Sequence, residues 1–132
     1  MAEVRIQNLL KKFEDITAVD HISLTVHSGE FVSLVGPSGC GKTTTLNLIA
    51  GFINPDAGEI SIDGEQINDV PIYKRKLGMV FQSYALFPHM TVMDNIAFGL
   101  RMQKLERSVI EKEVGRALEL VRLPGVEKRY PR

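Results

Sequence analysis

The sequence predicts an α/β fold with an antiparallel β component near its start and helices toward its end. Three observations predict this class. A buried-strand pattern at 31–35 leads directly into a glycine-rich loop and then a helical pattern at 42–50. The segment 21–26 alternates polar and apolar residues, as a strand buried on one face does. Beyond residue 91 the apolar spacing becomes helical.

Composition limits the classes of protein that the chain can represent. Its 132 residues suit one ordinary domain, and 44% apolar residues are enough for a packed core. Sixteen basic and sixteen acidic residues balance, so we expect no nucleic-acid partner. Cys40 is the sole cysteine, which excludes a disulfide framework. With no apolar run near the roughly 18 residues of a membrane span and no secretory signal, we expect a cytoplasmic chain with no direct membrane span.

The first third of the chain reads as short strands. We expect strands at 4–6 and 21–26, separated from the next element by a turn at 28–30. The segment 31–35 is mostly β-branched or aromatic, and it predicts a buried strand of a parallel sheet.

Two further strands and one helix are expected in the middle of the chain. The helix at 42–50 should end at Gly51. A loop at 54–58 then precedes an alternating strand at 59–64, which closes in an Asp-Gly turn. The apolar run 77–81 predicts another strand.

The last third predicts two helices. The first begins near Thr91. The second should begin at a capping box, in which Ser108 accepts from a backbone N–H and Glu111 reaches back. Its buried face comprises Ile110, Val114, Ala117, Leu118 and Val121, and Pro124-Gly125 should end it.

The segment 36–43 reads Gly-Pro-Ser-Gly-Cys-Gly-Lys-Thr, which is the phosphate-binding loop pattern. Glycines let successive N–H groups point inward and let the backbone approach phosphate oxygens. The following helix turns its exposed N–H groups toward the anion. Lys42 can reach the β- and γ-phosphates, and the hydroxyl of Thr43 can coordinate Mg²⁺. The pattern therefore predicts a site for a nucleoside triphosphate.

Alternatives stay open for the loop as a whole and for Cys40. The loop could be a glycine-rich turn with a solvated lysine. Cys40 could be a reactive thiol, because a helix N-terminus and a neighbouring lysine favour the thiolate, or only a small side chain. The loop by itself does not separate kinases, GTPases, motor ATPases and transport ATPases.

Four stretches together resemble the ATPase subunit of ATP-binding-cassette (ABC) transporters. They are 36–45, 51–60, 76–82 and 83–92, and the resemblance runs along essentially the whole chain. It looks most like the bacterial importer subgroup for polyamines, ferric iron, sulfate or sugars. The resemblance implies a partial P-loop NTPase-type fold with an antiparallel β subdomain and the start of a helical subdomain. These parts would be 1–30 and 59–64 (β subdomain), 31–58 and 76–83 (core), and 84–132 (helical).

The resemblance assigns site residues position by position. Phe13 falls where the family stacks an aromatic ring on adenine, and Gln82 falls where a glutamine serves catalysis near Mg²⁺ and the attacking water. Lys42 would be the second catalytic residue, and Thr43 and Gln82 would be the metal ligands. The ATP-binding set is Phe13, Gly36, Pro37, Ser38, Gly39, Cys40, Gly41, Lys42, Thr43 and Thr44. Phe13 as a strand-end residue and Gln82 as a surface side chain are the alternatives.

Partners and location also follow from the resemblance. The segment 84–88 would help to form an apolar groove for a short helix of a membrane-spanning subunit, unless Leu86 and Phe87 are ordinary core. A second copy of the ATPase subunit would complete the site. The complete protein would lie on the cytoplasmic face of the cell membrane and couple ATP hydrolysis to solute import.

Other family motifs are missing from the 132 residues. We find no run of four apolar residues followed by Asp-Glu, no Leu-Ser-Gly-Gly-Gln signature and no switch histidine. We therefore expect the first part of a longer subunit, marginally stable by itself, that holds ATP without appreciable hydrolysis. A natural short ATP-binding or docking module without turnover is the alternative, and an unrelated nucleotide kinase is a third.

Overall fold

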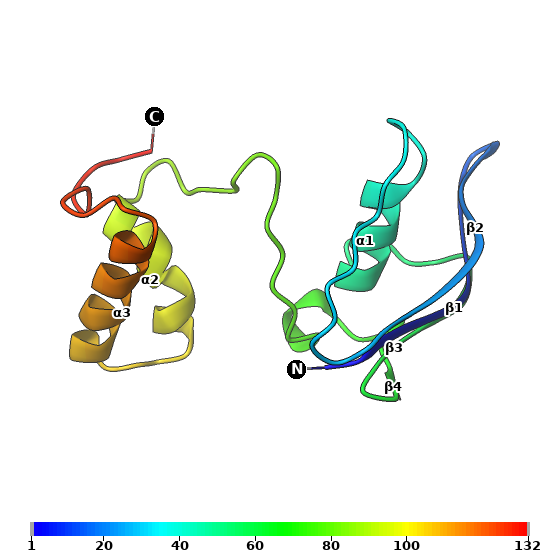
Figure 1. Cartoon of the computed structure of the whole chain (residues 1–132), viewed down its shortest axis with the longest axis horizontal. Helices are drawn as coiled ribbons and strands as arrows, with labels where there is room; N and C mark the ends of the chain where they lie inside the picture. Colours follow the sequence, from blue (N-terminus) through cyan, green and yellow to red (C-terminus); the bar gives the residue numbers. More distant parts are fainter. Residues whose placement is uncertain (1, 132) are drawn as a thin grey trace. The chain divides into compact units, whose positions relative to one another are not determined.

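The computed structural model describes residues 2–131, which form two compact units, 2–79 and 80–131. Strands and one helix make up the first unit, and two helices make up the second (Figure 1).

The first unit contains a four-stranded sheet in the order β2-β1-β3-β4, and every pairing is antiparallel. The strands are β1 (Val4–Phe13), β2 (Ile16–Val26), β3 (Ala57–Ile62) and β4 (Glu65–Gln66). In the middle of the sheet, Val4 of β1 faces Val26 on one side and Ile62 on the other. The expected antiparallel component is confirmed, although β1 and β2 are longer than the sequence predicted.

Helix α1 (Lys42–Ala50) packs on this sheet through one fully buried side chain, Leu48. The helix has the bounds that the sequence predicted, and Gly51 ends it in a left-handed conformation with φ 88°. The apolar cluster between helix and sheet comprises Ile6, Leu9, Val19, Leu48, Ile60 and Ile67. The core of this unit therefore fixes the position of the helix that follows the glycine-rich loop.

Two predicted strands are not formed. The segments 31–35 and 77–81 carry no strand, and Phe31, Val35 and Val80 are 93%, 90% and 94% exposed. A strand needs hydrogen-bond partners on a neighbouring chain segment, and within residues 2–131 no segment pairs with either run. The apolar pattern shows only a local preference, so the expectation of two buried strands was wrong for this chain. A short 3₁₀ helix, η1 (Ile72–Lys74), precedes the second run.

The second unit pairs α2 (Val92–Met102) with α3 (Arg107–Leu120), which lie side by side in Figure 1. The helix start predicted near Thr91 is confirmed, and the structure adds that the Thr91 side chain caps α2 by accepting from the backbone N–H of Asp94. On α3, the buried residues Ile110, Val114 and Leu118 pack against Ala97 of α2. The apolar face was therefore predicted correctly at these three positions, whereas Ala117 is half-buried and Val121 lies beyond the helix and is 59% exposed.

The predicted capping box of the last helix is not formed. Helix α3 begins at Arg107, and its N-cap is Glu106, two residues before the predicted cap Ser108, with no side-chain cap bond. Ser108 lies inside the first turn. Glu111 instead accepts from Nε of Arg107 at 2.8 Å, an i,i+4 pair that competes for the carboxylate the box would have used.

Candidate functional site

The glycine-rich loop ends in a tight junction between β2 and α1. Gly41 has φ 89°, and a Cβ at this position would lie 2.2 Å from the carbonyl oxygen of Ala18. Thr45 donates to the carbonyl of Gly41 from its backbone N–H (2.8 Å) and from its hydroxyl (3.0 Å). Only glycine allows this conformation and this approach together, so Gly41 fixes where the helix begins.

Lys42 folds back over the loop. Its Nζ donates to the carbonyls of Gly36 (2.8 Å) and Pro37 (2.6 Å), and it lies 3.3 Å from Sγ of Cys40. The ammonium is thus held among the atoms that form the loop. An incoming phosphate would offer charged oxygens in place of these neutral carbonyls, and charge-assisted hydrogen bonds are the stronger kind.

The N-terminus of α1 offers a favourable field for an anion. No acidic residue occupies its first turn, and the helix dipole places partial positive charge there. Thr43 is exposed at this end, whereas Thr44 is half-buried. Ser38 and Gly39 lie in the exposed turn of the loop, where Gly39 has φ 83°. The loop residues predicted to bind phosphate are therefore brought together.

A hollow of about 570 Å³ adjoins the loop. Residues of β2, of the segment 33–35, of the loop and of α1 line it, including Val19, Asp20, Leu34, Cys40, Lys42 and Thr45. Asp20 is the one carboxylate among the described residues that line it, and this group pairs with Nδ1 of His21 at 2.7 Å. The hollow therefore combines an apolar wall with one lysine and one engaged carboxylate.

Phe13 lies at the end of β1, paired with Ile16 across the hairpin, and is 46% exposed. The next residue of β2, Thr17, lines the hollow beside the loop. Nζ of Lys11 lies 5.5 Å from the centre of the Phe13 ring. Phe13 is thus a partly exposed aromatic at the hairpin end that borders the loop, and its stacking role stays a prediction.

Gln82 belongs to the second unit, where it is exposed and begins a turn that runs to residue 85. The sequence placed it at the end of a strand, and that context was wrong because 77–81 is not a strand. Its role near Mg²⁺ stays a prediction.

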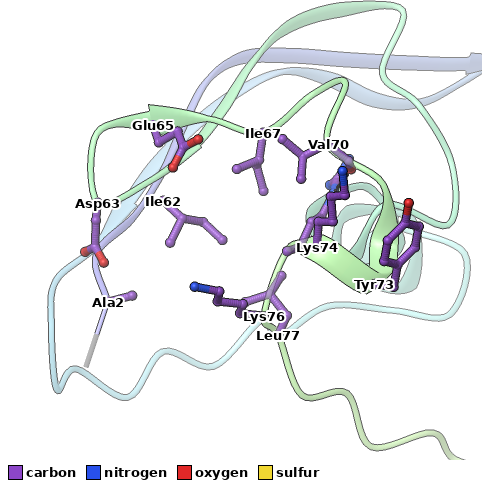
Figure 2. A pocket seen from close by; sticks show the side chains of 11 residues that line it. Ala2, Ile62, Asp63, Glu65, Ile67, Val70, Tyr73, Lys74, Lys76 and Leu77 are labelled. Carbon is purple, nitrogen blue, oxygen red and sulfur yellow. Dashed lines mark hydrogen bonds between the residues drawn. The ribbon is translucent and has the colours of Figure 1, made fainter. Parts of the chain in front are cut away.

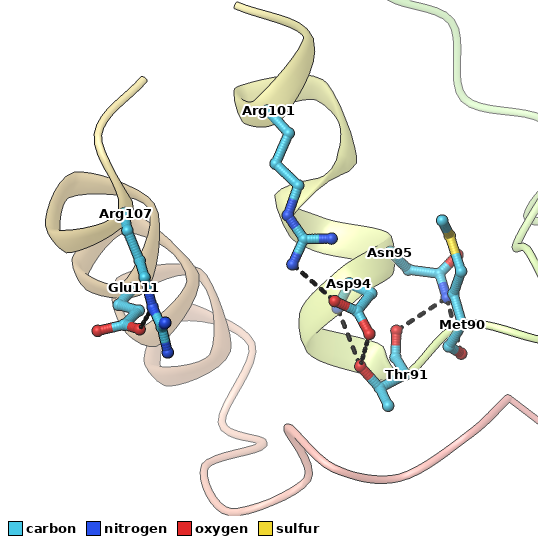
Figure 3. Close-up of polar contacts among 7 residues, drawn as sticks. All are labelled: Met90, Thr91, Asp94, Asn95, Arg101, Arg107 and Glu111. Atoms are coloured by element: carbon cyan, nitrogen blue, oxygen red, sulfur yellow. Dashed lines mark hydrogen bonds and ion pairs between the residues drawn. The ribbon is translucent and has the colours of Figure 1, made fainter. Parts of the chain in front are cut away.

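An amide side chain holds the segment that follows Gln82. Nδ2 of Asn95 donates to the carbonyls of Phe87, Met90 and Thr91 at 2.9–3.2 Å, and its Oδ1 accepts from the N–H of Phe87 at 2.8 Å. Figure 3 shows the amide beside Met90 and Thr91. The Phe87 ring also contacts Phe98, with ring centres 4.9 Å apart. Asn95 could not be recognised from the sequence, since a polar residue inside a helix has no distinctive local pattern.

The exposed apolar surface predicted at 84–88 is present in this unit. Tyr84, Leu86 and Phe87 are 79%, 53% and 39% exposed. Leu86 and Phe87 are therefore not fully buried core residues. Whether a partner helix covers them stays a prediction.

Asp94 forms a hydrogen bond and an ion pair in the first turn of α2. Its carboxylate accepts from the hydroxyl of Thr91 at 2.6 Å and from Nη2 of Arg101 at 2.6 Å (Figure 3). These two bonds, the Thr91 bond first, hold the pKa of Asp94 below its usual value of 3.8.

A second hollow of the first unit, about 780 Å³, has an apolar floor and charges of both signs at its rim. Figure 2 shows Lys76 extending into it toward the side where Ala2 and Asp63 lie. Buried Arg75 also lines it. No motif of the sequence analysis pointed to this region.

Within residues 2–131, no three histidine, cysteine or acidic side chains gather closely enough to hold a metal ion by themselves. None of the helices in that range is both long and apolar enough to span a membrane.

Comparison with known proteins gives three findings. A model of the ABC transporter family matches residues 19–132. The Spermidine/putrescine import ATP-binding protein PotA of Rubrobacter xylanophilus is 54% identical over 97% of this chain, and that of Nitrosomonas eutropha is 52% identical over 99%. This chain covers only 34% and 36% of those two proteins, or about a third of their length.

Among solved structures, a dimeric ATP-binding cassette in a post-hydrolysis state, bound to ADP and Pi, superimposes with a TM-score of 0.85. The sequence identity is 30%, and the match covers 97% of this chain and 61% of that one.

Proposed function

This chain belongs to the ABC transporter family, and on that basis we propose that it forms the phosphate-binding part of an ATP-binding subunit that powers solute import. The observation that carries the proposal is the junction of loop and helix. Gly41 fixes the start of α1 against β2, and Lys42 lies over the loop that would hold the phosphates. The match to a cassette bound to ADP and Pi supports the same ligand class.

The residues at the loop fit a magnesium nucleotide. Mg²⁺ prefers oxygen ligands, keeps several waters and is commonly held by one or two protein groups together with phosphate oxygens. The exposed hydroxyl of Thr43 is an oxygen ligand of this kind, at the end of α1 where the phosphates would bind. When bound, Mg²⁺ would neutralise charge on the phosphates.

Hydrolysis by this chain alone is not expected. The loop hollow has Asp20 as its one carboxylate among the described residues, and His21 engages it. ABC-type hydrolysis needs an acidic residue for Mg²⁺ and a group that orients the attacking water. We therefore propose ATP binding with negligible turnover for these residues, and transport-coupled turnover for a complete subunit. Turnover near one per second that Lys42→Ala abolishes would refute this.

Cys40 provides a direct test of ATP binding. It is the sole cysteine and lies exposed in the loop, so bound phosphates should shield its thiol. At ten times the dissociation constant, Mg-ATP should slow alkylation by N-ethylmaleimide about tenfold, because only about a tenth of the chain stays free. Adenosine, which lacks phosphates, should not protect.

Matched lysine variants complete this test. At the same concentration of Mg-ATP, Lys42→Ala should reduce the protection to about twofold or less, whereas Lys104→Ala, at an exposed position after α2, should keep it. Equal protection in both variants would contradict the assignment of the loop.

We propose a polyamine as the imported solute, and a membrane-spanning subunit and a second ATPase copy as partners. The names of the relatives support the solute, and the dimeric cassette supports the second copy. Uptake of labelled putrescine by cells that carry the complete gene, compared with cells whose gene encodes Lys42→Ala, tests the solute. Equal uptake would contradict it.

A further inference from the structure

Arg75 is the one charged side chain in the described core, with only 6% of its surface exposed. Its guanidinium donates to four backbone carbonyls. Two belong to the last turn of α1, Leu48 (3.0 Å) and Ile49 (2.8 Å). The other two are Asn68 (3.0 Å) and Val70 (2.8 Å). The side chain therefore ties the end of α1 to the backbone of residues 68–70.

The end of α1 supplies the negative charge that this cation needs. A buried guanidinium is costly without compensation, and none of the ion pairs of the described residues includes Arg75. The last carbonyls of a helix carry partial negative charge and lack partners within the helix. Gly51 leaves room for the contact, because a Cβ there would lie 2.6 Å from Nε and Cζ of Arg75.

Helix α1 is thus held at both ends. Gly41 fits its first end against the carbonyl of Ala18, and Arg75 binds its last carbonyls. Nine residues span about 14 Å and act as one rigid segment, so a change in the direction of α1 caused at its last turn also re-orients its first turn. The end opposite Arg75 carries Lys42 and Thr43.

We propose that Arg75 is a positioning residue of the nucleotide site, which holds α1 at the angle at which Thr43 meets Mg²⁺ and Lys42 meets the phosphates. The inference rests on the proposed function, because it assumes that the loop binds Mg-ATP. It adds a residue whose contacts lie at the far end of the helix and which no motif indicates.

The two components of nucleotide binding should respond differently. Contacts between loop N–H groups and phosphate are local, since they depend on the loop's own conformation. A contact between the Thr43 hydroxyl and Mg²⁺ would depend on the direction of α1, because Mg²⁺ tolerates little displacement of its ligands. Substitution of Arg75 should therefore reduce the gain in ATP affinity that Mg²⁺ provides, and should affect ATP binding without the metal less.

The test compares the chain with its variants Arg75→Lys, Arg75→Met and Arg5→Met. Lysine keeps a charge near the helix end but cannot form the guanidinium fork. Arg5 is an exposed residue of β1 and serves as the matched control. The dissociation constant of ATP is measured with Mg²⁺ and with EDTA, and the far-ultraviolet circular dichroism spectrum reports whether each variant is folded.

We expect Arg75→Lys to stay folded. The Mg²⁺ enhancement, which is the ratio of the ATP dissociation constant in EDTA to that in Mg²⁺, should fall about three- to tenfold in this variant, as expected for coupling through a packed helix. Arg5→Met should keep it. An unchanged enhancement in Arg75→Lys would overturn the inference, and so would an equal loss with and without metal, which indicates reduced folding alone. If Arg75→Met fails to fold, the Mg²⁺ dependence of ATP binding by Arg75→Lys is the test of the inference. Wild-type protein that binds no ATP would instead refute the proposed function.

Discussion

Gly41→Ala offers the sharpest perturbation of the loop. The left-handed conformation at φ 89° costs alanine about 1–2 kcal/mol of conformational free energy relative to glycine. Its Cβ would also lie 2.2 Å from the carbonyl oxygen of Ala18, whereas ordinary contact begins at 3.4 Å, so β2 and the helix start must separate by roughly 1 Å. Overpacking of this kind costs about 1–3 kcal/mol. We expect the free energy of unfolding to fall by about 2–5 kcal/mol in total.

Gly39→Ala is the matched control for this prediction. Gly39 has nearly the same conformation, φ 83°, but nothing lies within 4 Å of the Cβ position. Only the conformational cost of about 1–2 kcal/mol should remain. Urea unfolding measures both variants, and Gly41→Ala should exceed its control by about 1–3 kcal/mol. Equal losses would refute the argument that the close approach to Ala18 fixes the start of α1.

Three further predictions concern other parts of the chain. Asn95→Ala should cost about 1–3 kcal/mol, because backbone groups lose their partner, and should speed amide exchange at Phe87; unchanged exchange there would contradict this. The pKa of Asp94 is lowered, so its contribution is present above the unfolded value near 3.8 and is lost as pH falls through the folded pKa. Thermal melts from pH 7 to pH 2 should therefore show a smaller acid loss in Asp94→Asn, and an unchanged profile would refute that role. Val35→Lys should reduce aggregation in light scattering, because Val35 is 90% exposed in an unpaired apolar segment; equal scattering would count against strand pairing as its cause.

The phosphate loop and α1 could be predicted from sequence because their signals are local. Glycine spacing, the lysine at the helix start and Gly51 at its end all act within a few residues of their own positions. Parts of the two hairpin strands were also predicted, 4–6 and 21–26, the second because alternation reports burial on one face. Local chemistry was therefore enough for the part of the site that carries the proposal.

The strands predicted at 31–35 and 77–81 are not formed, which shows the limit of prediction from local patterns. Their composition favours extended chain, but a strand exists only when a neighbour supplies hydrogen bonds, and the described residues supply none. The capping box failed for a related reason. Glu111 had a second available partner, Arg107, and sequence spacing could not rank the two.

Arg75 and Asn95 could not be recognised before the structure. Arg75 binds carbonyls 26 and 27 residues away along the chain, and backbone carbonyls leave no mark in the sequence. Asn95 binds closer groups, but only the path of the 87–91 segment brings them to its amide. Buried polar side chains that satisfy backbone groups are thus the features that sequence patterns miss most readily.

Calorimetric titration of Mg-ATP into the chain and into Lys42→Ala tests the central claim most directly. The wild-type chain should bind one ATP per chain saturably, and the variant should bind at least about tenfold more weakly, a loss of 1.4 kcal/mol or more. Equal affinity of the two proteins for Mg-ATP would contradict the assignment of the loop at residues 36–43 as a triphosphate site.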